Sequence, residues 1–222
     1  MQRALISVSD KRGVVAFAQE LIRLGWEVVS TGGTAALLRD AGCSVTTVDE
    51  ITGFPEILDG RVKTLHPVVH AGLLARPDRP EHVRVMKEHG IASFQLVAVN
   101  LYPFRATIAH PDVSFEDAIE NIDIGGPSML RSAAKNFEFV LPVVDPRDYG
   151  QVIELVAGGE IPLEVRQGFA AKVFTHTSDY DNAIAGYLTP RQDSLPERIA
   201  LAMERRQVLR YGENPQQRAA LY

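Results

Sequence analysis

Cysteine is nearly absent from this sequence: the 222 residues include only Cys43. A single thiol cannot form an intramolecular disulfide, and it cannot supply a zinc site made of cysteines alone. No apolar run approaches the roughly 18–20 residues that a membrane-spanning helix needs. The first residues are too polar and their apolar run is too short for a secretion signal. We therefore expect a soluble, cytoplasmic protein that does not contact a membrane.

An excess of positive charge is also missing. The chain has 23 Lys and Arg against 28 Asp and Glu, a formal net charge of −5. Proteins that bind nucleic acid usually present a basic surface to its phosphates, so we expect no nucleic-acid partner. This balance still allows a local basic pocket that holds one phosphate.

Several common ligand-binding motifs are absent. The sequence contains no GxGxxG, GxxxxGK[ST] or GxSxG pattern, which argues against dinucleotide, nucleoside triphosphate and serine-hydrolase sites. His66 and His70 have the spacing of two zinc ligands on a helix, but no glutamate lies between them and no third ligand stands out. We therefore expect no metal site.

Short apolar runs alternate with helical patterns through residues 1–150. Strands are predicted at 4–8, 27–30, 45–48, 96–99 and 139–144, and amphipathic helices lie between most of them. The run at 96–99 is continuously apolar, as is typical of a parallel strand covered on both faces. The pattern predicts an α/β fold with a doubly wound, mostly parallel sheet. Residues 52–75 show neither the hydrophobic period of a helix nor that of a strand.

The pattern becomes helical after residue 146. The strongest helical stretch covers residues 163–187, and its apolar face carries Phe169, Val173 and Ile184. Residues 189–197 include two prolines and several polar residues, which is typical of a linker. We therefore predict a domain at 1–188, with the sheet at about 1–145 and a helical C-terminal extension at about 146–188. A separate segment follows at 189–222.

Polar residues follow three of the predicted strands where each strand ends. They are Ser7, Ser9 and Lys11 after the first strand, residues 30–34 after the second, and Asn100 and Tyr102 after the strand at 96–99. The carboxyl ends of parallel strands meet at one edge of a sheet, and ligands of doubly wound proteins bind there. The sequence therefore predicts a ligand site at this edge.

Two glycine pairs each open a predicted helix. Gly32 and Gly33 allow backbone N–H groups to approach an anion at the positive end of a helix, although a tight strand-to-helix turn explains them equally well. Gly125 and Gly126 follow Asp123. This aspartate either caps the helix or carries a proton during a reaction.

Two positive charges lie two residues apart, at Arg61 and Lys63. Pro67 disfavours helix at the preceding residue, and in an extended segment residues two apart share a face. An anion between the two side chains would explain the pair, and so would a solvated edge. Lys135 also has two explanations. It could act in a site, or it could be favoured at a helix C-terminus because its charge suits the helix dipole.

Eight motifs occur in a familiar order. They are SVSDK at 7–11, STGGT at 30–34, TGFPE at 52–56, GRVKTLHP at 60–67, NLYPF at 100–104, NIDIGG at 121–126, AAKN at 133–136 and FTHT at 174–177. Together they closely resemble the N-terminal IMP cyclohydrolase domain of the AICAR transformylase/IMP cyclohydrolase family. The resemblance extends to about residue 188. The run LRYGENP at 209–215 looks like the entrance to that family's transformylase domain.

The resemblance implies a fold, a reaction and partners. The fold is a sheet of the methylglyoxal-synthase-like type. The reaction closes 5-formamidoimidazole-4-carboxamide ribonucleotide (FAICAR) to IMP and water without a cofactor. Formyl transfer is expected only in a longer chain. The full-length family is dimeric, largely through its transformylase half, so both a monomer and a weaker homodimer stay open for these 222 residues.

The resemblance also assigns roles to residues. The phosphate and ribose would be held by Lys11, Ser30, Gly32, Gly33, Thr34, Arg61 and Thr64, with Ser7 and Ser9 completing the substrate-binding set. The base would be read by Asn100, Ile124 and Gly125, and the catalytic group would be Lys63, Tyr102, Asp123 and Lys135. We assign Lys63 and the backbone near Ile124 to the formyl oxyanion. Asp123, Tyr102 and Lys135 would form a proton relay.

Three other functions compete with this one. A regulatory module of the same fold would bind a phosphate ligand without turning it over. Methylglyoxal synthase uses the same scaffold as a lyase and needs no residues that read a base. A nicotinamide-dependent dehydrogenase is disfavoured, because its glycine fingerprint is missing.

Overall fold

Five parallel strands form the central sheet, in the order β3-β2-β1-β4-β5. The strands are β1 (Arg3–Val8), β2 (Glu27–Ser30), β3 (Val45–Thr47), β4 (Leu96–Asn100) and β5 (Leu141–Val143). Ile6 pairs with Ser30 on one side of β1, and Val8 pairs with Asn100 on the other. The predicted doubly wound parallel sheet is confirmed. The carboxyl ends of its strands meet at one edge.

The computed structural model describes residues 1–189, 203 and 205–222. These residues form two compact units, 1–180 and 181–222. Residues 190–202 and 204 lie outside the described residues, and they include all of the predicted linker at 189–197 except residue 189. The domain boundary at 188 therefore stays a prediction.

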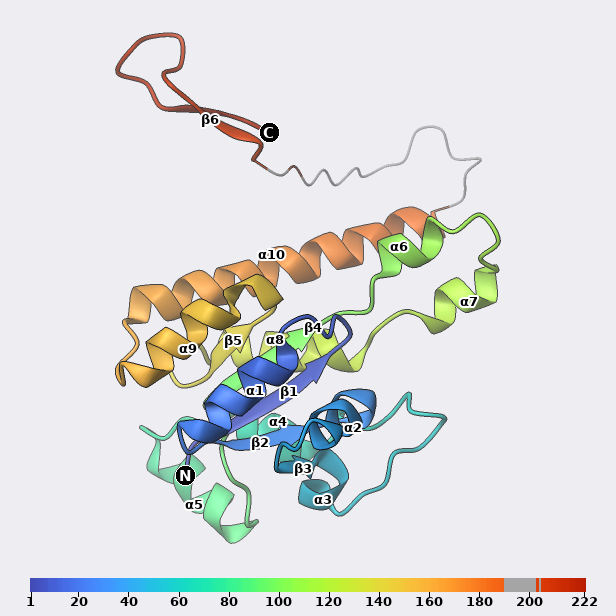
Figure 1. Ribbon diagram of the computed structural model, residues 1–222, viewed down its shortest axis with the longest axis vertical. Helices are drawn as coiled ribbons and strands as arrows, with labels where there is room; N and C mark the ends of the chain where they lie inside the picture. The colour runs from blue at the N-terminus through green and yellow to red at the C-terminus, as the bar shows by residue number, and fades with distance from the viewer. Residues whose placement is uncertain (190–202, 204) are drawn as a thin grey trace. The chain divides into compact units, whose positions relative to one another are not determined.

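Helices connect the strands (Figure 1). They are α1 (Val14–Arg23), α2 (Gly32–Asp40), α3 (Val48–Thr52), α4 (Pro67–Leu74), α5 (Pro80–Glu88), α6 (Phe104–Ile108), α7 (Phe115–Glu120), α8 (Gly125–Lys135), the 3-10 turn Pro146–Asp148, α9 (Tyr149–Ala157) and α10 (Leu163–Leu188). None of the helices in the described part is long and apolar enough to cross a membrane.

Side chains alternate between two buried faces of the sheet. Ala4 and Ile6 of β1 belong to a core cluster that also holds Phe17 of α1, Val152 of α9 and Phe169 of α10. On the other face, α8 packs on β4 and β5 and α4 packs on α8. Helices thus cover both faces, which explains why residues 96–99 are apolar at every position.

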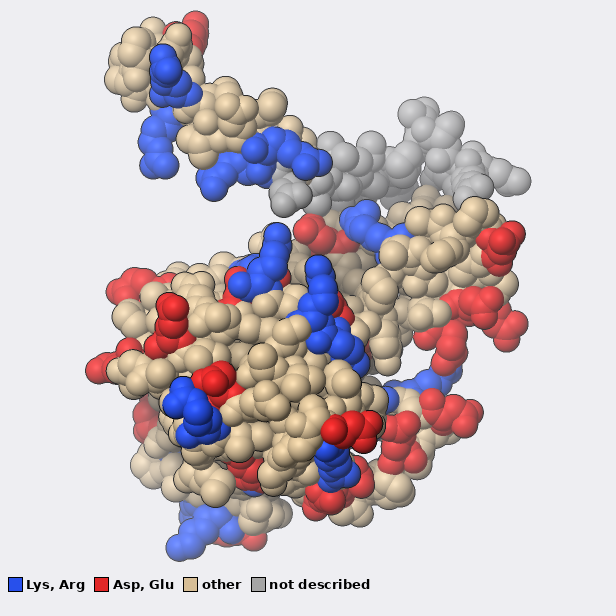
Figure 2. Space-filling model, viewed as in Figure 1, with Lys and Arg blue, Asp and Glu red and all other residues tan. Residues whose placement is uncertain are grey.

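The segment from residue 181 onward contains a small hairpin. Strands β6 (Gln207–Leu209) and β7 (Ala219–Leu221) pair antiparallel, with Val208 opposite Ala220. In Figure 2, basic and acidic side chains are interspersed over the unit that holds the sheet, whereas the hairpin segment carries mostly basic ones.

Helix α4 lies in the stretch that showed no clear period. His66 caps it by accepting a hydrogen bond from the Val68 N–H at Nδ1, and Pro67 occupies the first helical position. Its apolar residues are not confined to one stripe, because α4 lies against other elements over much of its surface. Sequence periodicity therefore could not reveal it.

The start of α1 is capped by Gly13, whose φ of 70° is left-handed. Ser9 and Asp10 belong to the loop that follows β1 at the carboxyl edge of the sheet.

Gly72 of α4 allows a close approach that an alanine would prevent. A Cβ there would lie 2.9 Å from the Ala92 carbonyl oxygen and 2.9 Å from the ring of Phe94, which is fully buried. We expect Gly72→Ala to lower the free energy of unfolding by about 1–3 kcal/mol, measured by urea denaturation.

Gly168→Ala is the matched control for this prediction. Gly168 is exposed in α10 and a Cβ there meets nothing within 4 Å. Alanine should stabilise this helix by about 0.5–1 kcal/mol. Equal effects of the two substitutions would contradict the packing at Gly72.

Candidate active site at the carboxyl edge of the sheet

A cavity of about 660 Å³ lies where the strands end. Its walls come from the loop after β1, the start of α2, residues 59–64, the end of β4 and the junction of α7 with α8. Most of the predicted site residues line it: Ser7, Ser9, Lys11, Gly32, Gly33, Thr34, Arg61, Lys63, Thr64, Asn100, Tyr102, Asp123, Ile124 and Gly125. The fold therefore brings together residues that are more than 100 positions apart in the sequence.

Ser30 and Lys135 are placed elsewhere. Ser30 is fully buried, and its hydroxyl donates to the Ile6 carbonyl oxygen at 2.6 Å, so it ties β2 to β1. Lys135 is the exposed last residue of α8, whose first residue, Gly125, lines the cavity. At 1.5 Å per residue, the two backbone positions are about 15 Å apart along the helix. The assigned roles of Ser30 and Lys135 therefore stay predictions that this cavity does not support.

The start of α2 forms one end of the cavity. Lys11 donates from Nζ to Thr34 Oγ1 at 2.7 Å and also to the Val8 carbonyl oxygen. Although much of its side chain is exposed, partial burial of the ammonium group lowers the pKa of Lys11. A positive side chain and the N-terminus of a helix thus face the same space, an arrangement that suits an anion.

Lys63 reaches the same end from another segment. Its Nζ lies 3.7 Å from the position that a Cβ on Gly32 would occupy. Gly32 has a φ of +42°, which disfavours other residues. This glycine therefore provides both the backbone turn and the space beside the lysine.

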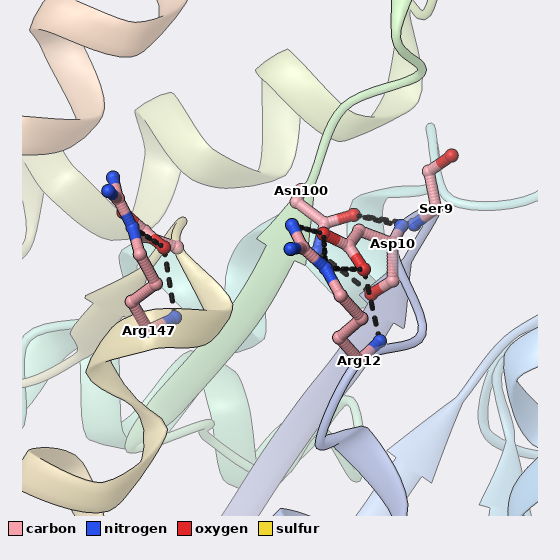
Figure 3. A network of polar contacts seen from close by, with 6 residues as sticks. Ser9, Asp10, Arg12, Asn100 and Arg147 are labelled. Carbon is pink, nitrogen blue, oxygen red and sulfur yellow. Dashed lines mark hydrogen bonds and ion pairs between the residues drawn. The ribbon is translucent and has the colours of Figure 1, made fainter.

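Asn100 holds the loop that carries Lys11 (Figure 3). Its Oδ1 accepts from the backbone N–H groups of Ser9 at 2.6 Å and Asp10 at 2.8 Å, and its Nδ2 donates to the Asp10 carbonyl oxygen at 3.2 Å. Both acceptor positions of the amide are thus used, and one N–H remains for a ligand. Asn100 positions the loop, whether or not it also reads a base.

Asp123 lies at the other end of the cavity, beside the start of α8. Its Oδ1 accepts from the Gly126 N–H at 2.9 Å, and its own N–H donates to the Tyr180 hydroxyl oxygen at 2.7 Å. Burial raises the pKa of Asp123, while hydrogen bonds from the Gly126 and Tyr102 N–H groups and the charge of Lys63 oppose that rise. A carboxyl group with a raised pKa in a cavity is a candidate proton carrier.

The second glycine pair is required by close side-chain contacts. A Cβ on Gly125 would lie 2.5 Å from Thr64 Oγ1, and one on Gly126 would lie 2.4 Å from Asp123 Oδ2 and 2.8 Å from Leu101 Cδ2. Neither glycine has a positive φ. Their function here is to let Thr64 and Asp123 approach the backbone.

Sequence reasoning did not single out Glu56, Glu120 or Tyr180. Glu120 accepts from Arg61 Nε at 3.0 Å although the two are 59 positions apart, and Glu56 lies 3.6 Å from Lys63 Nζ. No local spacing indicates such pairings. Among the residues that the structure describes, no group of three His, Cys, Asp or Glu side chains could hold a metal ion.

A family model described as an MGS-like domain matches residues 13–128. The chain belongs to the MGS-like domain family. A second family model, described as the AICARFT/IMPCHase bienzyme, matches residues 133–222 of the same chain.

Known relatives of this MGS-like chain include the bifunctional purine biosynthesis proteins PurH. The protein from Leuconostoc mesenteroides is 59% identical over 222 residues, and that from Streptococcus mutans is 58% identical over 223 residues. Each match covers 100% of this chain and 43% of the relative, so the chain spans less than half of their length. The family resemblance drawn from the motifs is confirmed.

A solved structure is also similar to this MGS-like chain. The crystal structure of ForH aligns with a TM-score of 0.76 and 42% sequence identity, covering 83% of this chain and 95% of that one.

Asp123→Asn should stabilise the protein near neutral pH. Burial raises the pKa of Asp123 in the folded state above its unfolded value, so the ionised carboxylate destabilises the fold at pH 7. This cost disappears as the pH falls through the raised pKa. Asparagine retains an oxygen for the Gly126 N–H and carries no charge. We expect a higher urea midpoint than wild type at pH 7 and a difference that shrinks on acidification.

Asp112→Asn is the control, because Asp112 is exposed in the loop before α7. It should change the urea midpoint little at either pH. A midpoint for Asp123→Asn at or below that of wild type at pH 7 would show that burial of the carboxylate is not costly.

Proposed function

We propose that this chain is an IMP cyclohydrolase that closes FAICAR to IMP and water. The observation that carries the proposal is a cavity with a helix start suited to an anion at one end and a carboxyl group of raised pKa at the other. The similarity to PurH and to the AICARFT/IMPCHase model supports it. Because the chain spans 43% of those relatives, we do not propose formyl transfer for these residues.

The reaction makes definite demands on a site. The carboxamide nitrogen attacks the formyl carbon, a C–N bond forms, and the formyl oxygen becomes an oxyanion. That oxygen then leaves as water, taking one hydrogen from the carboxamide nitrogen and one from the formamido nitrogen. The site must therefore orient the two groups, stabilise the oxyanion and move two protons. All reacting atoms belong to one molecule, so the site contributes by holding the formyl group in the attacking conformer.

The start of α2 is the proposed binding site for the 5′-phosphate. Its free N–H groups, with Lys11 beside them, offer positive charge and hydrogen-bond donors. Arg61 and Lys63 extend the same end of the cavity. Contacts with a phosphate that does not react hold the reacting groups in place, which is how remote binding energy contributes to catalysis.

The start of α8 is the proposed site of the chemistry. Backbone N–H groups at Ile124 and Gly125 lie at the positive end of this helix, and Lys63 acts on the charge of the nearby Asp123. We assign these groups to the formyl oxyanion, where each donor contributes about 2.7–4 kcal/mol in comparable sites.

Asp123 and Tyr102 are the proposed proton relay. Asp123 would take a proton from the attacking nitrogen and return it to the departing oxygen, since its raised pKa suits a group that exchanges protons. Tyr102 lines the same cavity, and its backbone N–H faces the Asp123 carboxylate. Lys135 stays a predicted member of this relay and needs a separate test.

We further propose that the protein acts in the cytoplasm and that two copies associate, as the family resemblance implies. In longer relatives, the segment after residue 188 would lead into a transformylase domain. The hairpin of β6 and β7 belongs to the part of the chain matched by the AICARFT/IMPCHase model.

The first experiment supplies FAICAR to the purified protein, without metal or folate, and follows IMP by absorbance. We expect turnover, and a loss of about 100-fold or more in kcat for both Lys63→Ala and Asp123→Asn. Lys135→Ala is measured beside them: a comparable loss would support its place in the relay, and near-normal turnover would remove it. Binding of IMP without consumption of FAICAR would contradict the proposal and favour a regulatory module.

Gly126→Ala should lower kcat without touching a reacting group. The added methyl group would lie 2.4 Å from Asp123 Oδ2, so the carboxylate must move. Misplacing a catalytic group by about 1 Å costs on the order of 100-fold. Gly150→Ala in α9, where a Cβ meets nothing within 4 Å, is the control. Normal kcat in a folded Gly126→Ala variant would argue against a catalytic role for Asp123.

A further inference from the structure

Two of the cations at the phosphate end of the cavity face a carboxylate. Arg61 donates from Nε to Glu120 Oε1 at 3.0 Å and makes a second bond from Nη2 to Oε2. Lys63 Nζ lies 3.6 Å from Glu56 Oε2. Both of these positive side chains are therefore already close to a negative one.

Glu56 lies directly beside the start of α2. It lines a small hollow next to the main cavity, together with Thr31, Gly32 and Lys63. A Cβ on Gly60 would lie 2.7 Å from Glu56 Oε1 and 3.5 Å from Lys63 Nζ. A side chain at this position would crowd the Glu56 carboxylate beside Lys63.

Glu120 approaches the same end from a different element. It is the last residue of α7 and lines the main cavity with Arg61. Both side chains are more than half exposed, at 58% and 61%, and such exposed ion pairs contribute little to folding stability. The position of this pair at the cavity is better explained by an effect on the ligand than by an effect on the fold.

The carboxylates leave only part of the positive charge unopposed. Asp59 adds a further negative charge that acts on Arg61. Lys11, in contrast, is bonded to the uncharged oxygens of Val8 and Thr34. The positive charge of Lys11 thus meets neutral oxygens, whereas carboxylates stand beside the neighbouring cations Arg61 and Lys63.

We propose that Glu56 and Glu120 are specificity-determining residues that restrict the site to a nucleoside monophosphate. This inference rests on the proposed function for the place of the 5′-phosphate. A second phosphate group, as in a nucleoside diphosphate, would bring more negative charge close to these carboxylates. The repulsion, and the need to separate Arg61 and Lys63 from their partners, would weaken its binding.

The test compares the dissociation constants of IMP and IDP by calorimetry. Wild type should bind IDP more weakly than IMP. Glu120→Gln and Glu56→Gln should each improve IDP binding relative to IMP about three- to tenfold, the range expected for removing one charge near a partly exposed site. Glu120→Asp, which keeps the charge, should retain the wild-type ratio.

Glu116→Gln is the matched control. Glu116 lies one turn earlier on α7 and is exposed, so its substitution removes the same charge from the same helix. The ratio of the IDP and IMP dissociation constants should then stay within about twofold of the wild-type ratio. A ratio that is unchanged in both Glu120→Gln and Glu56→Gln, or wild type binding IDP as tightly as IMP, would overturn the inference.

FAICAR turnover in the same preparations separates the two proposals. Turnover with an unchanged IDP-to-IMP ratio would contradict this inference and leave the cyclohydrolase proposal standing. A shifted ratio without turnover would support the inference and contradict the cyclohydrolase proposal.

Discussion

Parallel pairing on both sides of β1 is the constraint on which the rest of this structure depends. Hydrogen bonding to β2 on one side and β4 on the other brings the loops after all three strands to one edge. The chain leaves β1 for one side and later returns to its other side, which opens a crevice at that edge. Lys11, the start of α2, and Tyr102 meet there for this reason alone.

The two helix starts around this crevice differ in what surrounds them. The start of α2 faces Lys11 and Lys63, so it suits an anion that stays unchanged. The start of α8 faces Asp123, whose carboxyl is partly desolvated and therefore easier to protonate. A substrate that places its phosphate at the start of α2 and its reacting groups at the start of α8 would use both helix starts. Binding and chemistry would thus use the two helix starts of one cavity, and Lys63 acts toward both of them.

Much of this arrangement could be predicted from local sequence patterns. Alternating strands and helices indicated the sheet, and polar residues at the strand ends indicated the edge where a ligand binds. Other features depend on contacts between distant segments. The pairing of Arg61 with Glu120 and the hydrogen bond between Asp123 and Tyr180 have no local signature. Lys135 is the opposite case: it belongs to a sequence motif, but α8 places it away from the cavity.

The sequence by itself determined the fold class, the family and the types of residue at the strand ends. Hydrophobic periodicity and short motifs are local properties, and a local property can be read without knowing which segments meet. Only the tertiary structure decided which charges face one another, why a side chain at Gly125 or Gly126 would displace Thr64 or Asp123, and that Asn100 holds a loop. Those outcomes depend on distances of a few ångströms between segments, which the packing of the helices on the sheet sets.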